Sequence, residues 1–346
     1  MFLASDNTSP AHPKVMERVM DANTDFAMPY GADPIMEEVR ERVRDTFEAP
    51  DAAVYLVATG TAANALALAC YCQPYQTIFC SPVAHLHEDE CNAPEFFSAG
   101  AKLTLVPGDH KMTPAALREA ILAKEVRGVH GPQRGPVSIT QVTERGGVYS
   151  LDALRVLTEV AQSFSLPVHL DGARFGNALV KLGCTPAEMT WKIGVDVVSF
   201  GGTKNGCMGV EAVVFFDPEK AWEFELRRKR GAHLFSKHRY LSAQMAAYLK
   251  DDLWLDCARA ANANAARLVQ GMSRGPVRMV HMPEANMIFA AFPRRLHQKL
   301  HDAGAKYYIW EGALEGDDPE EELQARLVCD WSLSDEQIDL FLSHFE

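Results

Sequence analysis

Hydrophobic residues along this chain fall into two patterns: short apolar runs and longer segments with helical spacing. The short runs are rich in Val, Ile, Leu, Phe and Tyr and predict strands over 52–57, 77–81, 101–106, 136–141, 166–173, 194–202 and 210–217. Helical segments follow most of them, for example 62–71, 113–123 and 150–164. Since strands that alternate with helices are typical of βαβ units, the pattern predicts an α/β fold with a mainly parallel sheet wrapped by helices.

The pattern changes after about residue 245. A helical stretch over 241–272 is long enough to link two domains, and strands over 285–292 and 325–331 follow it with a helix at 294–304 between them. The last segment opens with the capping-box pair Ser334 and Gln337. We therefore predict a large domain over 1–245, including an N-terminal arm, and a small α+β domain over 246–346.

Composition and charge narrow the classes of partner. The chain has 346 residues, 47% of them hydrophobic, and a formal net charge of −12. A nucleic acid or an anionic membrane needs a basic surface, so neither is expected as the main partner. We see no secretory signal and no apolar run long enough to span a membrane. The eight cysteines are scattered, which indicates reduced thiols and a cytoplasmic location rather than disulfides or a zinc site.

Polar residues follow several of the predicted strands. In an open α/β sheet, ligands bind beyond the carboxyl ends of the strands, so these side chains should meet in one crevice. They are Gly60, Thr61, His85, His87, Asp171, Arg174 and Lys204.

Each of these features has an ordinary explanation when it is taken alone. T-G-T and Asp-Gly are common turns, and a lysine beside glycines is usually solvated. The H-x-H pair at 85–87 has no third ligand at a metal-binding distance in sequence, so we expect no metal. Together, a strand-to-helix turn that favours phosphate, a carboxylate and a lysine are the groups that pyridoxal 5'-phosphate requires.

The motifs that carry this combination resemble the L-threonine aldolase family of fold-type I pyridoxal-phosphate enzymes, in the bacterial branch with phenylserine and low-specificity threonine aldolases. "HLDGAR" (169–174) and "GGTKNG" (201–206) are the most specific, and 33 residues separate Asp171 from Lys204, which fits the family's spacing. The other matching segments are "ASDN", "PYGADP", "ATGTAAN", "AHLHEDECNAPEFFSAGAKL", "KHRYLSAQ" and "ARLVCDW". The resemblance implies a large domain with a mainly parallel seven-stranded sheet and a small α+β C-terminal domain.

The resemblance also implies how the cofactor is held. Lys204 would form the Schiff base, and Asp171 would pair with the pyridine nitrogen and keep it protonated. His85 would stack on the ring and lie near enough to act as a base. Gly60 and Thr61 would hold the phosphate.

Other implied roles concern the substrate and a neighbouring subunit. Arg174 and Arg326 would bind the substrate carboxylate with help from Ser5, and Arg174 would also lie beside the cofactor. Arg239 resembles a residue that reaches the phosphate from a neighbouring subunit, and Tyr30 resembles a cleft residue shared across that boundary.

The basic run over 227–239 is predicted to be mostly a solvated helix face, with a subset that faces a partner subunit's site. This arrangement needs a homo-oligomer with shared active sites, and the resemblance suggests a dimer of dimers.

One position departs from the family pattern. Many members carry "ENTH" after the fourth strand, and Thr143 takes the place of that histidine here. A threonine hydroxyl is a poor base. The base for the substrate β-hydroxyl is then His85 or a water that it holds, with His87, a loop residue that would contact substrate, in reserve. Asp89 and Glu90 are expected to begin a helix; a second interpretation places one of them beside the substrate hydroxyl.

The activity implied by the resemblance is retro-aldol cleavage of L-β-hydroxy-α-amino acids to glycine and an aldehyde. Three alternatives remain open: a β-eliminating lyase or aminotransferase of the same fold, a pyridoxal-phosphate protein without catalysis, and a folate-dependent hydroxymethyl transferase. The last would need extra folate-contacting elements, for which the chain is too short. The lysine–aspartate–arginine set argues against a non-catalytic protein.

Overall fold

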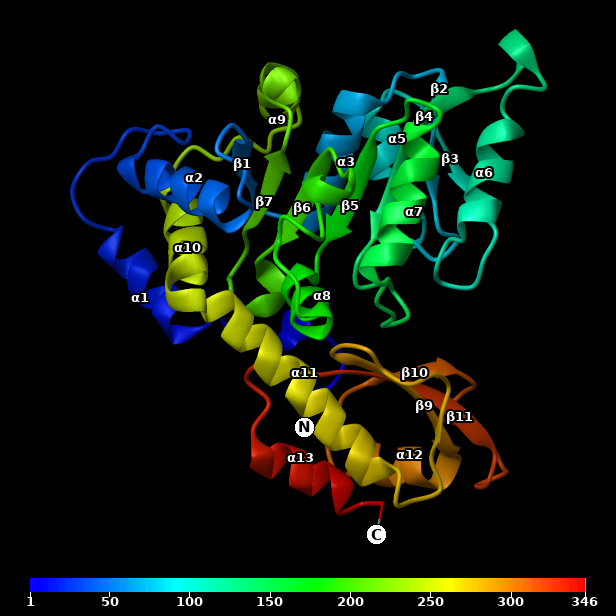
Figure 1. The fold of residues 1–346 in the computed structure, drawn as a ribbon. Helices are drawn as coiled ribbons and strands as arrows, with labels where there is room; N and C mark the ends of the chain where they lie inside the picture. Colours follow the sequence, from blue (N-terminus) through cyan, green and yellow to red (C-terminus); the bar gives the residue numbers. More distant parts are fainter. Residues whose placement is uncertain (346) are drawn as a thin grey trace.

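A seven-stranded sheet forms the centre of the large domain in this computed structural model, which describes residues 1–345 (Figure 1). The strands are β1 (Ala53–Val57), β2 (Gln76–Cys80), β3 (Lys102–Leu105), β4 (Gln133–Thr140), β5 (Val168–Gly172), β6 (Val197–Gly201) and β7 (Glu211–Phe215). They lie in the order β1-β7-β6-β5-β4-β2-β3. Only β7 runs antiparallel to its neighbours, so the predicted α/β class, strand count and mainly parallel sheet are confirmed.

Helices cover both faces of this sheet because successive residues of each strand point to opposite sides. On one side, Val198 and Phe200 of β6 pack with the helices α7 (Leu151–Gln162) and α8 (Phe175–Leu182). On the other, Val197 packs with α3 (Gly60–Tyr71) and α9 (Ala221–Arg230). The strands β6 and β7 are buried on both faces, which explains why their sequences are largely apolar, whereas the edge strand β3 alternates and is partly exposed.

The remaining helices of the large domain lie around this core. They are α1 (Pro13–Asp21), α2 (Pro34–Thr46), α4 (His85–Glu88), α5 (Ala93–Phe97), α6 (Pro114–Leu122) and α10 (Arg239–Leu249). Thr113 caps α6 through the amide of Ala116, and Pro114 is its first residue, as predicted. The helices α1 and α2 both pack on α10.

The helical stretch predicted over 241–272 is broken. Asp251 and Asp252 have φ angles of 51° and 55°, which separate α10 from α11 (Leu253–Met272). Aspartate is one of the few residues that tolerate this left-handed conformation, and apolar periodicity does not report it.

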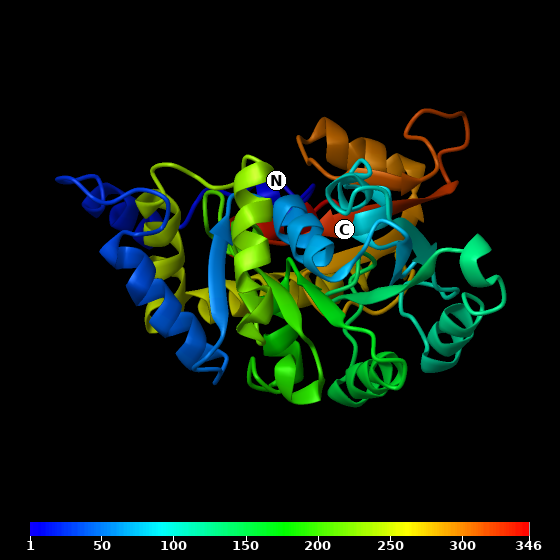
Figure 2. The same cartoon turned by 90° about the horizontal axis from the view of Figure 1, so that it is seen from above.

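Two hydrophobic cores meet along α11. Its first half contributes Trp254 and Cys257 to the core of the large domain, and its second half contributes Leu268 and Met272 to a second core. Figure 1 shows α11 running from the large sheet down to the C-terminal part, and Figure 2 shows that part lying to one side of the large sheet.

The second core belongs to a four-stranded sheet in the order β10-β11-β9-β8. Its elements are β8 (Arg278–Met279), β9 (Met287–Pro293), α12 (Arg294–Asp302), β10 (Tyr308–Glu311), β11 (Glu322–Val328) and α13 (Asp335–Leu342). Ser334 caps α13 by accepting from the amide of Gln337. The first residues of the chain join this sheet, since the Leu3 amide donates to Lys306 and its carbonyl accepts from Val328.

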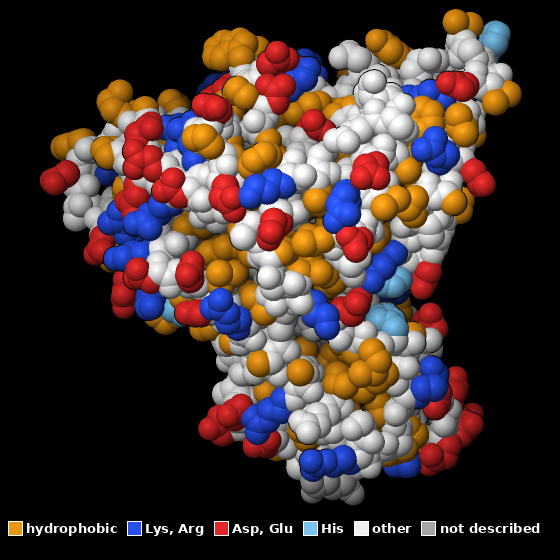
Figure 3. Space-filling model, viewed as in Figure 1, with side chains coloured by type: hydrophobic (Ala, Val, Ile, Leu, Met, Phe, Trp, Pro, Cys, Tyr) orange, Lys and Arg blue, Asp and Glu red, His pale blue; other side chains and the backbone are white. Residues whose placement is uncertain are grey.

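The surface carries charges of both signs, interspersed over the face that Figure 3 shows. Two residues of the basic run over 227–239 are buried, and the others are exposed or half-buried. Arg228 is 3% exposed, stacks 5.0 Å from the ring of Tyr55 and pairs with Glu225. His238 is 1% exposed and bonds Ser242. Arg228 lies on the inner side of α9, and His238 immediately precedes α10.

All eight cysteines are free thiols, and six of them are buried. Within residues 1–345, we find no helix with the length and apolar character needed to cross a membrane.

Candidate active site

A cavity of about 240 Å³ brings most of the predicted chemistry together. Gly60, Thr61, His85, Asp171 and Lys204 all line it, although they lie at the ends of four different strands, β1, β2, β5 and β6. The parallel strands point their carboxyl ends to one edge, which explains the convergence. The expectation of one shared crevice is therefore confirmed for these five residues.

The beginning of α3 forms one wall of the cavity. The side chain of Thr59 accepts the amide of Ala62, and the amide of Ala63 bonds the Thr59 carbonyl. The amides of Gly60 and Thr61 are in the first turn, where a helix offers them no partner. A Cβ added at Gly60 would meet nothing within 4 Å, so an anion can approach these amides closely.

Beyond Gly60, a chain of hydrogen bonds crosses the cavity floor. The side-chain amide of Asn64 donates to Oδ2 of Asp171 and to Oε1 of Glu90, both at 3.0 Å. The same Oε1 lies 2.9 Å from Nδ1 of His85. Asp171 also accepts the Ala173 amide at 3.0 Å. The chain joins Asp171 to His85, the two groups expected at the edge and the face of the cofactor ring.

Burial and neighbouring charges have opposite effects on the pKa values of the hydrogen-bonded groups. Burial disfavours the charged form of His85, but the hydrogen bond to Glu90 and the negative charges of Asp171 and Glu144 outweigh it and raise the pKa of His85. Burial also raises the pKa of Glu90, which the hydrogen bonds from His85 and Asn64 only partly offset. Glu90 lies between α4 and α5 with its side chain 0% exposed, so the expectation that it begins a helix is wrong.

Lys204 lies in a tight turn after β6. A Cβ on Gly202 would lie 2.7 Å from the carbonyl oxygen of Val210, so this close approach requires glycine. The carboxylate of Glu211 accepts the Gly202 amide at 2.8 Å. Asn205 donates to the Tyr248 hydroxyl at 2.8 Å, which anchors the other side of the turn.

Glu211 also lines the cavity and was missed by sequence reasoning. Burial raises its pKa to about 7. The available signal was one acidic residue at the head of the apolar run 210–217.

Arg174 is not free in this structure. Its Nε and Nη2 donate to the two carboxylate oxygens of Asp6 at 2.6 and 2.9 Å, and both side chains are at most 3% exposed. Asn286 donates to the same carboxylate at 3.1 Å. Burial opposes the charge of Asp6, but Arg174 and Lys204 outweigh it and lower the pKa of Asp6.

Arg326 has a different environment. One of its nitrogens donates to the carbonyl of Ala4 at 3.3 Å, and its guanidinium lies 5.9 Å from the ring centre of Trp310. Burial and the positive charge of Arg174 lower its pKa. Within residues 1–345 it has no carboxylate partner, and it lies within range of the charges of Arg174 and Asp6. Neither Arg326 nor Arg174 lines the cavity in this structure. Ser5, which caps the turn Asp6–Thr8, immediately follows Ala4.

The position of Thr143 has an unexpected neighbour. Nδ1 of His110 lies 2.8 Å from the Thr143 hydroxyl, which also accepts the amide of Gly147. His110 comes from the loop after β3, and no pattern in the sequence predicted that it would lie beside Thr143. His87 is exposed on α4 and does not line the cavity.

Tyr30 and Arg239 lie outside the cavity formed by this chain. Arg239 donates to the carbonyls of Thr24 and Asp25, which hold the segment before Tyr30. Tyr30 is 46% exposed. The predicted contacts of Tyr30 and Arg239 with a neighbouring subunit remain predictions.

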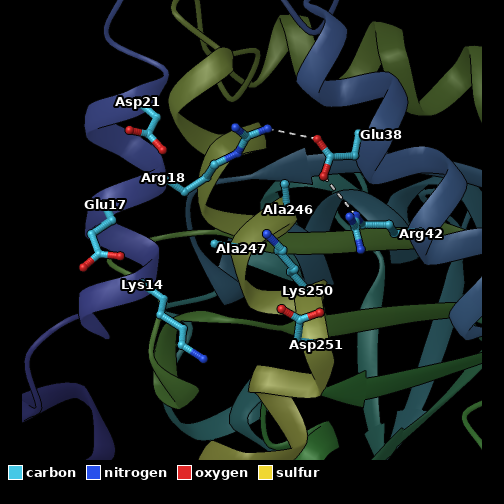
Figure 4. Close-up of a pocket in the computed structure, with 10 residues that line it drawn as sticks. All are labelled: Lys14, Glu17, Arg18, Asp21, Glu38, Arg42, Ala246, Ala247, Lys250 and Asp251. Carbon is cyan, nitrogen blue, oxygen red and sulfur yellow. Dashed lines mark hydrogen bonds and ion pairs between the residues drawn. The ribbon is translucent and has the colours of Figure 1, made fainter.

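A larger cavity of about 410 Å³ lies between α1, α2 and the end of α10 (Figure 4). Glu38 pairs with Arg18 and Arg42 across it, both at 3.0 Å. Its acidic and basic side chains are balanced in number, and none of the predicted site residues lines it. Size therefore does not identify the site; the convergence of Asp171 and Lys204 does.

Comparison with known sequences places this geometry in context. The model of the beta-eliminating lyase family matches residues 3–293. The chain is 39% identical to the low specificity L-threonine aldolase of Pseudomonas aeruginosa over 337 residues, which cover 97% of this chain and 94% of that protein.

Solved structures share the fold at lower identity. The threonine aldolase of Leishmania major has a TM-score of 0.91 at 23% identity, with 99% of this chain and 97% of that chain covered. The serine palmitoyltransferase of Sphingomonas wittichii has a TM-score of 0.71 at 16% identity and covers 100% and 86%. Enzymes of different chemistry therefore share the architecture.

Proposed function

The chain belongs to the beta-eliminating lyase family, in the group of L-threonine aldolases, and we propose that its Asp171–Lys204 cavity cleaves L-β-hydroxy-α-amino acids to glycine and an aldehyde. The substrates are L-threonine, L-allo-threonine and L-phenylserine. The observation that carries the proposal is the convergence of Lys204, Asp171, His85 and the start of α3 on one cavity.

These residues fit pyridoxal 5'-phosphate. Lys204 would supply the amine that holds the cofactor covalently, and the Asp171 carboxylate would accept a hydrogen bond from the protonated ring nitrogen. The free amides of Gly60 and Thr61 would bind the phosphate, since the space beside Gly60 admits it. When bound, the cofactor withdraws electrons from the substrate Cα and so permits the bond to Cβ to break.

The substrate carboxylate is bound by Arg326, whose guanidinium has no carboxylate partner of its own within residues 1–345. A planar guanidinium fixes a carboxylate in two directions, which sets the rotation of the substrate about Cα. Arg174 is held by Asp6 and adds positive charge beside this anchor. Ser5 lies beside Asp6 in the N-terminal arm and completes the carboxylate site.

His85 removes the proton of the β-hydroxyl. Its Nδ1 faces Glu90, so Nε2 is the ring nitrogen left for the substrate. The proton passes from the hydroxyl oxygen to Nε2, the Cα–Cβ bond breaks, and the oxygen leaves as the aldehyde carbonyl. A positioned base of this kind contributes on the order of 10²–10⁴ in rate.

The test is product analysis with the three substrates. We expect equal amounts of glycine and aldehyde, and the Lys204→Ala variant should lose the absorbance of the bound cofactor and almost all turnover. Lys102→Ala, an exposed lysine on β3, is the matched control. Formation of a 2-oxo acid in place of glycine would instead indicate an aminotransferase or a β-eliminating lyase. A Lys204→Ala variant with normal turnover would overturn the assignment.

We further propose a homo-oligomer, a dimer of dimers, with active sites shared between subunits. Phe26, Met28 and Tyr30 form an exposed apolar arm, and Trp222 and Leu226 are exposed on α9. Large apolar side chains gathered in this way are typical of interfaces. Analytical ultracentrifugation should give a tetramer, and a monomer with full activity would refute the sharing of sites. The buried, reduced cysteines support a cytoplasmic location.

A further inference from the structure

Two buried residues that the expected mechanism does not use, Asn64 and Glu90, connect His85 with Asp171. Asn64 donates to both carboxylates at 3.0 Å, and Oε1 of Glu90 lies 2.9 Å from Nδ1 of His85. Asn64 is 2% exposed and Glu90 is 3% exposed. Groups held in this way have little freedom to reorient.

The donor and the acceptor of each hydrogen bond between these residues follow from the chemistry of the side chains. Asn64 faces two carboxylates, which accept hydrogen bonds, so its NH₂ group must point to them. Oε1 of Glu90 therefore already accepts from Asn64. The same oxygen accepts from His85, which places the proton of the neutral imidazole on Nδ1 and leaves Nε2 unprotonated.

The backbone after Glu90 keeps the carboxylate inside. Cys91 and Asn92 have φ angles of 48° and 61°, a left-handed pair that turns the chain sharply between α4 and α5. This turn allows Glu90 to be buried while Glu88 and Asp89, its neighbours, stay exposed. The burial of Glu90 is therefore a property of the turn rather than of a regular helix.

We propose that Glu90 is a positioning residue that, together with Asn64, holds His85 through Nδ1, so that in the neutral imidazole Nε2 is the unprotonated nitrogen and the base for the substrate β-hydroxyl. The inference rests on the proposed function, because it assigns the tautomer of the base in that reaction. Glu90 does not touch the reacting atoms in this role. A carboxylate that orients an imidazole in this manner also stabilises the imidazolium that forms when the proton is accepted.

The charges around His85 favour the imidazolium that forms when Nε2 accepts the substrate proton. Asp171 on β5 and Glu144 after β4 add negative charge beside Glu90, and Lys204 after β6 is the cation that lines the same cavity. The balance raises the pKa of His85, as described above. Glutamine at position 90 keeps the shape and an acceptor oxygen but removes the negative charge, so the pKa of His85 should fall.

The experiment uses the holoenzyme labelled with ¹⁵N-histidine, with the His85 signals assigned by their absence in His85→Asn. In the wild-type protein, the neutral form of His85 should carry its proton on Nδ1. In Glu90→Gln, the titration of His85 should move to lower pH, and the acid limb of kcat/KM should move in the same direction. Glu88→Gln is the matched control, since Glu88 is exposed and two residues away.

Turnover gives a second readout. In Glu90→Leu, which offers no acceptor, kcat should fall on the order of tenfold or more while KM changes less than about twofold, because substrate binding does not use Nδ1. Glu90→Gln should recover part of that loss.

Two results would overturn the proposal. One is a neutral wild-type His85 with its proton on Nε2, a result that does not depend on a variant at position 90. The other is a His85 titration that is the same in Glu90→Gln and Glu88→Gln. If the tautomer is as assigned but no substrate is cleaved, the proposed function fails and the positioning of His85 by Glu90 still holds.

Discussion

The buried ion pair between Asp6 and Arg174 ties the N-terminal arm to the active site, and its removal has a calculable effect. Asp6 accepts three hydrogen bonds, two from Arg174 at 2.6 and 2.9 Å and one from Asn286 at 3.1 Å. In Asp6→Asn, the NH₂ group replaces an acceptor, so at least one of these donors loses its partner. The guanidinium then stays buried without a countercharge.

Breaking a buried pair by removal of one partner costs about 3–5 kcal/mol. Unfolding entropy is about 2.1 cal/mol/K per residue, so a chain of 346 residues should lose about 4–7 °C of thermal midpoint if it unfolds as one unit. The assay is differential scanning calorimetry of wild type and Asp6→Asn at pH 7. Asp152→Asn removes a pair with Arg155 in which both side chains are at least half exposed, and its midpoint should change by less than about 1 °C.

A carboxylate ligand supplies a second readout. Glycine should raise the midpoint of Asp6→Asn more than that of the wild type, because its carboxylate can partly replace the missing charge beside Arg174. Equal midpoints for Asp6→Asn and Asp152→Asn would refute the energetic reasoning. Equal stabilisation of wild type and Asp6→Asn by glycine would show that Arg174 does not reach the ligand.

Three further predictions concern the substrate, the base and acid stability. Arg326→Gln should raise KM for L-threonine at least about tenfold, since it removes the carboxylate anchor, and steady-state kinetics measures this. His85→Asn should lower kcat by on the order of 10²-fold or more, whereas His87→Asn, on an exposed face, should change it little; normal cleavage by His85→Asn would show that another group is the base. Burial lowers the pKa values of His169 and His297 to about 4 in the folded protein, so below pH 6.5 the unfolded chain binds more protons than the folded one. The free energy of unfolding should therefore be unaffected by these two histidines above pH 6.5 and should fall between pH 6.5 and 4 by about 1.4 kcal/mol per pH unit for each. Urea denaturation across that pH range measures this fall.

Local patterns in the sequence were sufficient to predict the strands of the large sheet and the convergence of several polar residues on one cavity. Each predicted strand of the large sheet is present, and apolar runs such as 194–202 and 210–217 contain strands that are buried on both faces. Gly60, Asp171 and Lys204 were found for a similar reason, since parallel strands bring the residues that follow them to one edge. The family resemblance added the cofactor and the reaction, which no periodicity reports.

Contacts between distant segments were decided only by the tertiary structure. Asp6 meets Arg174 across 168 positions of the chain, and His110 meets Thr143 across 33, so neither pair leaves a local pattern. An acidic residue such as Glu90 is typical of the solvated first turn of a helix, yet the left-handed turn at Cys91 and Asn92 allows Glu90 to be buried beside His85. Sequence patterns record what each residue requires of its immediate neighbours and of water. Which buried charge is matched with which partner depends on how the layers pack, because the cost of burial is offset only by groups that the fold brings within hydrogen-bond distance.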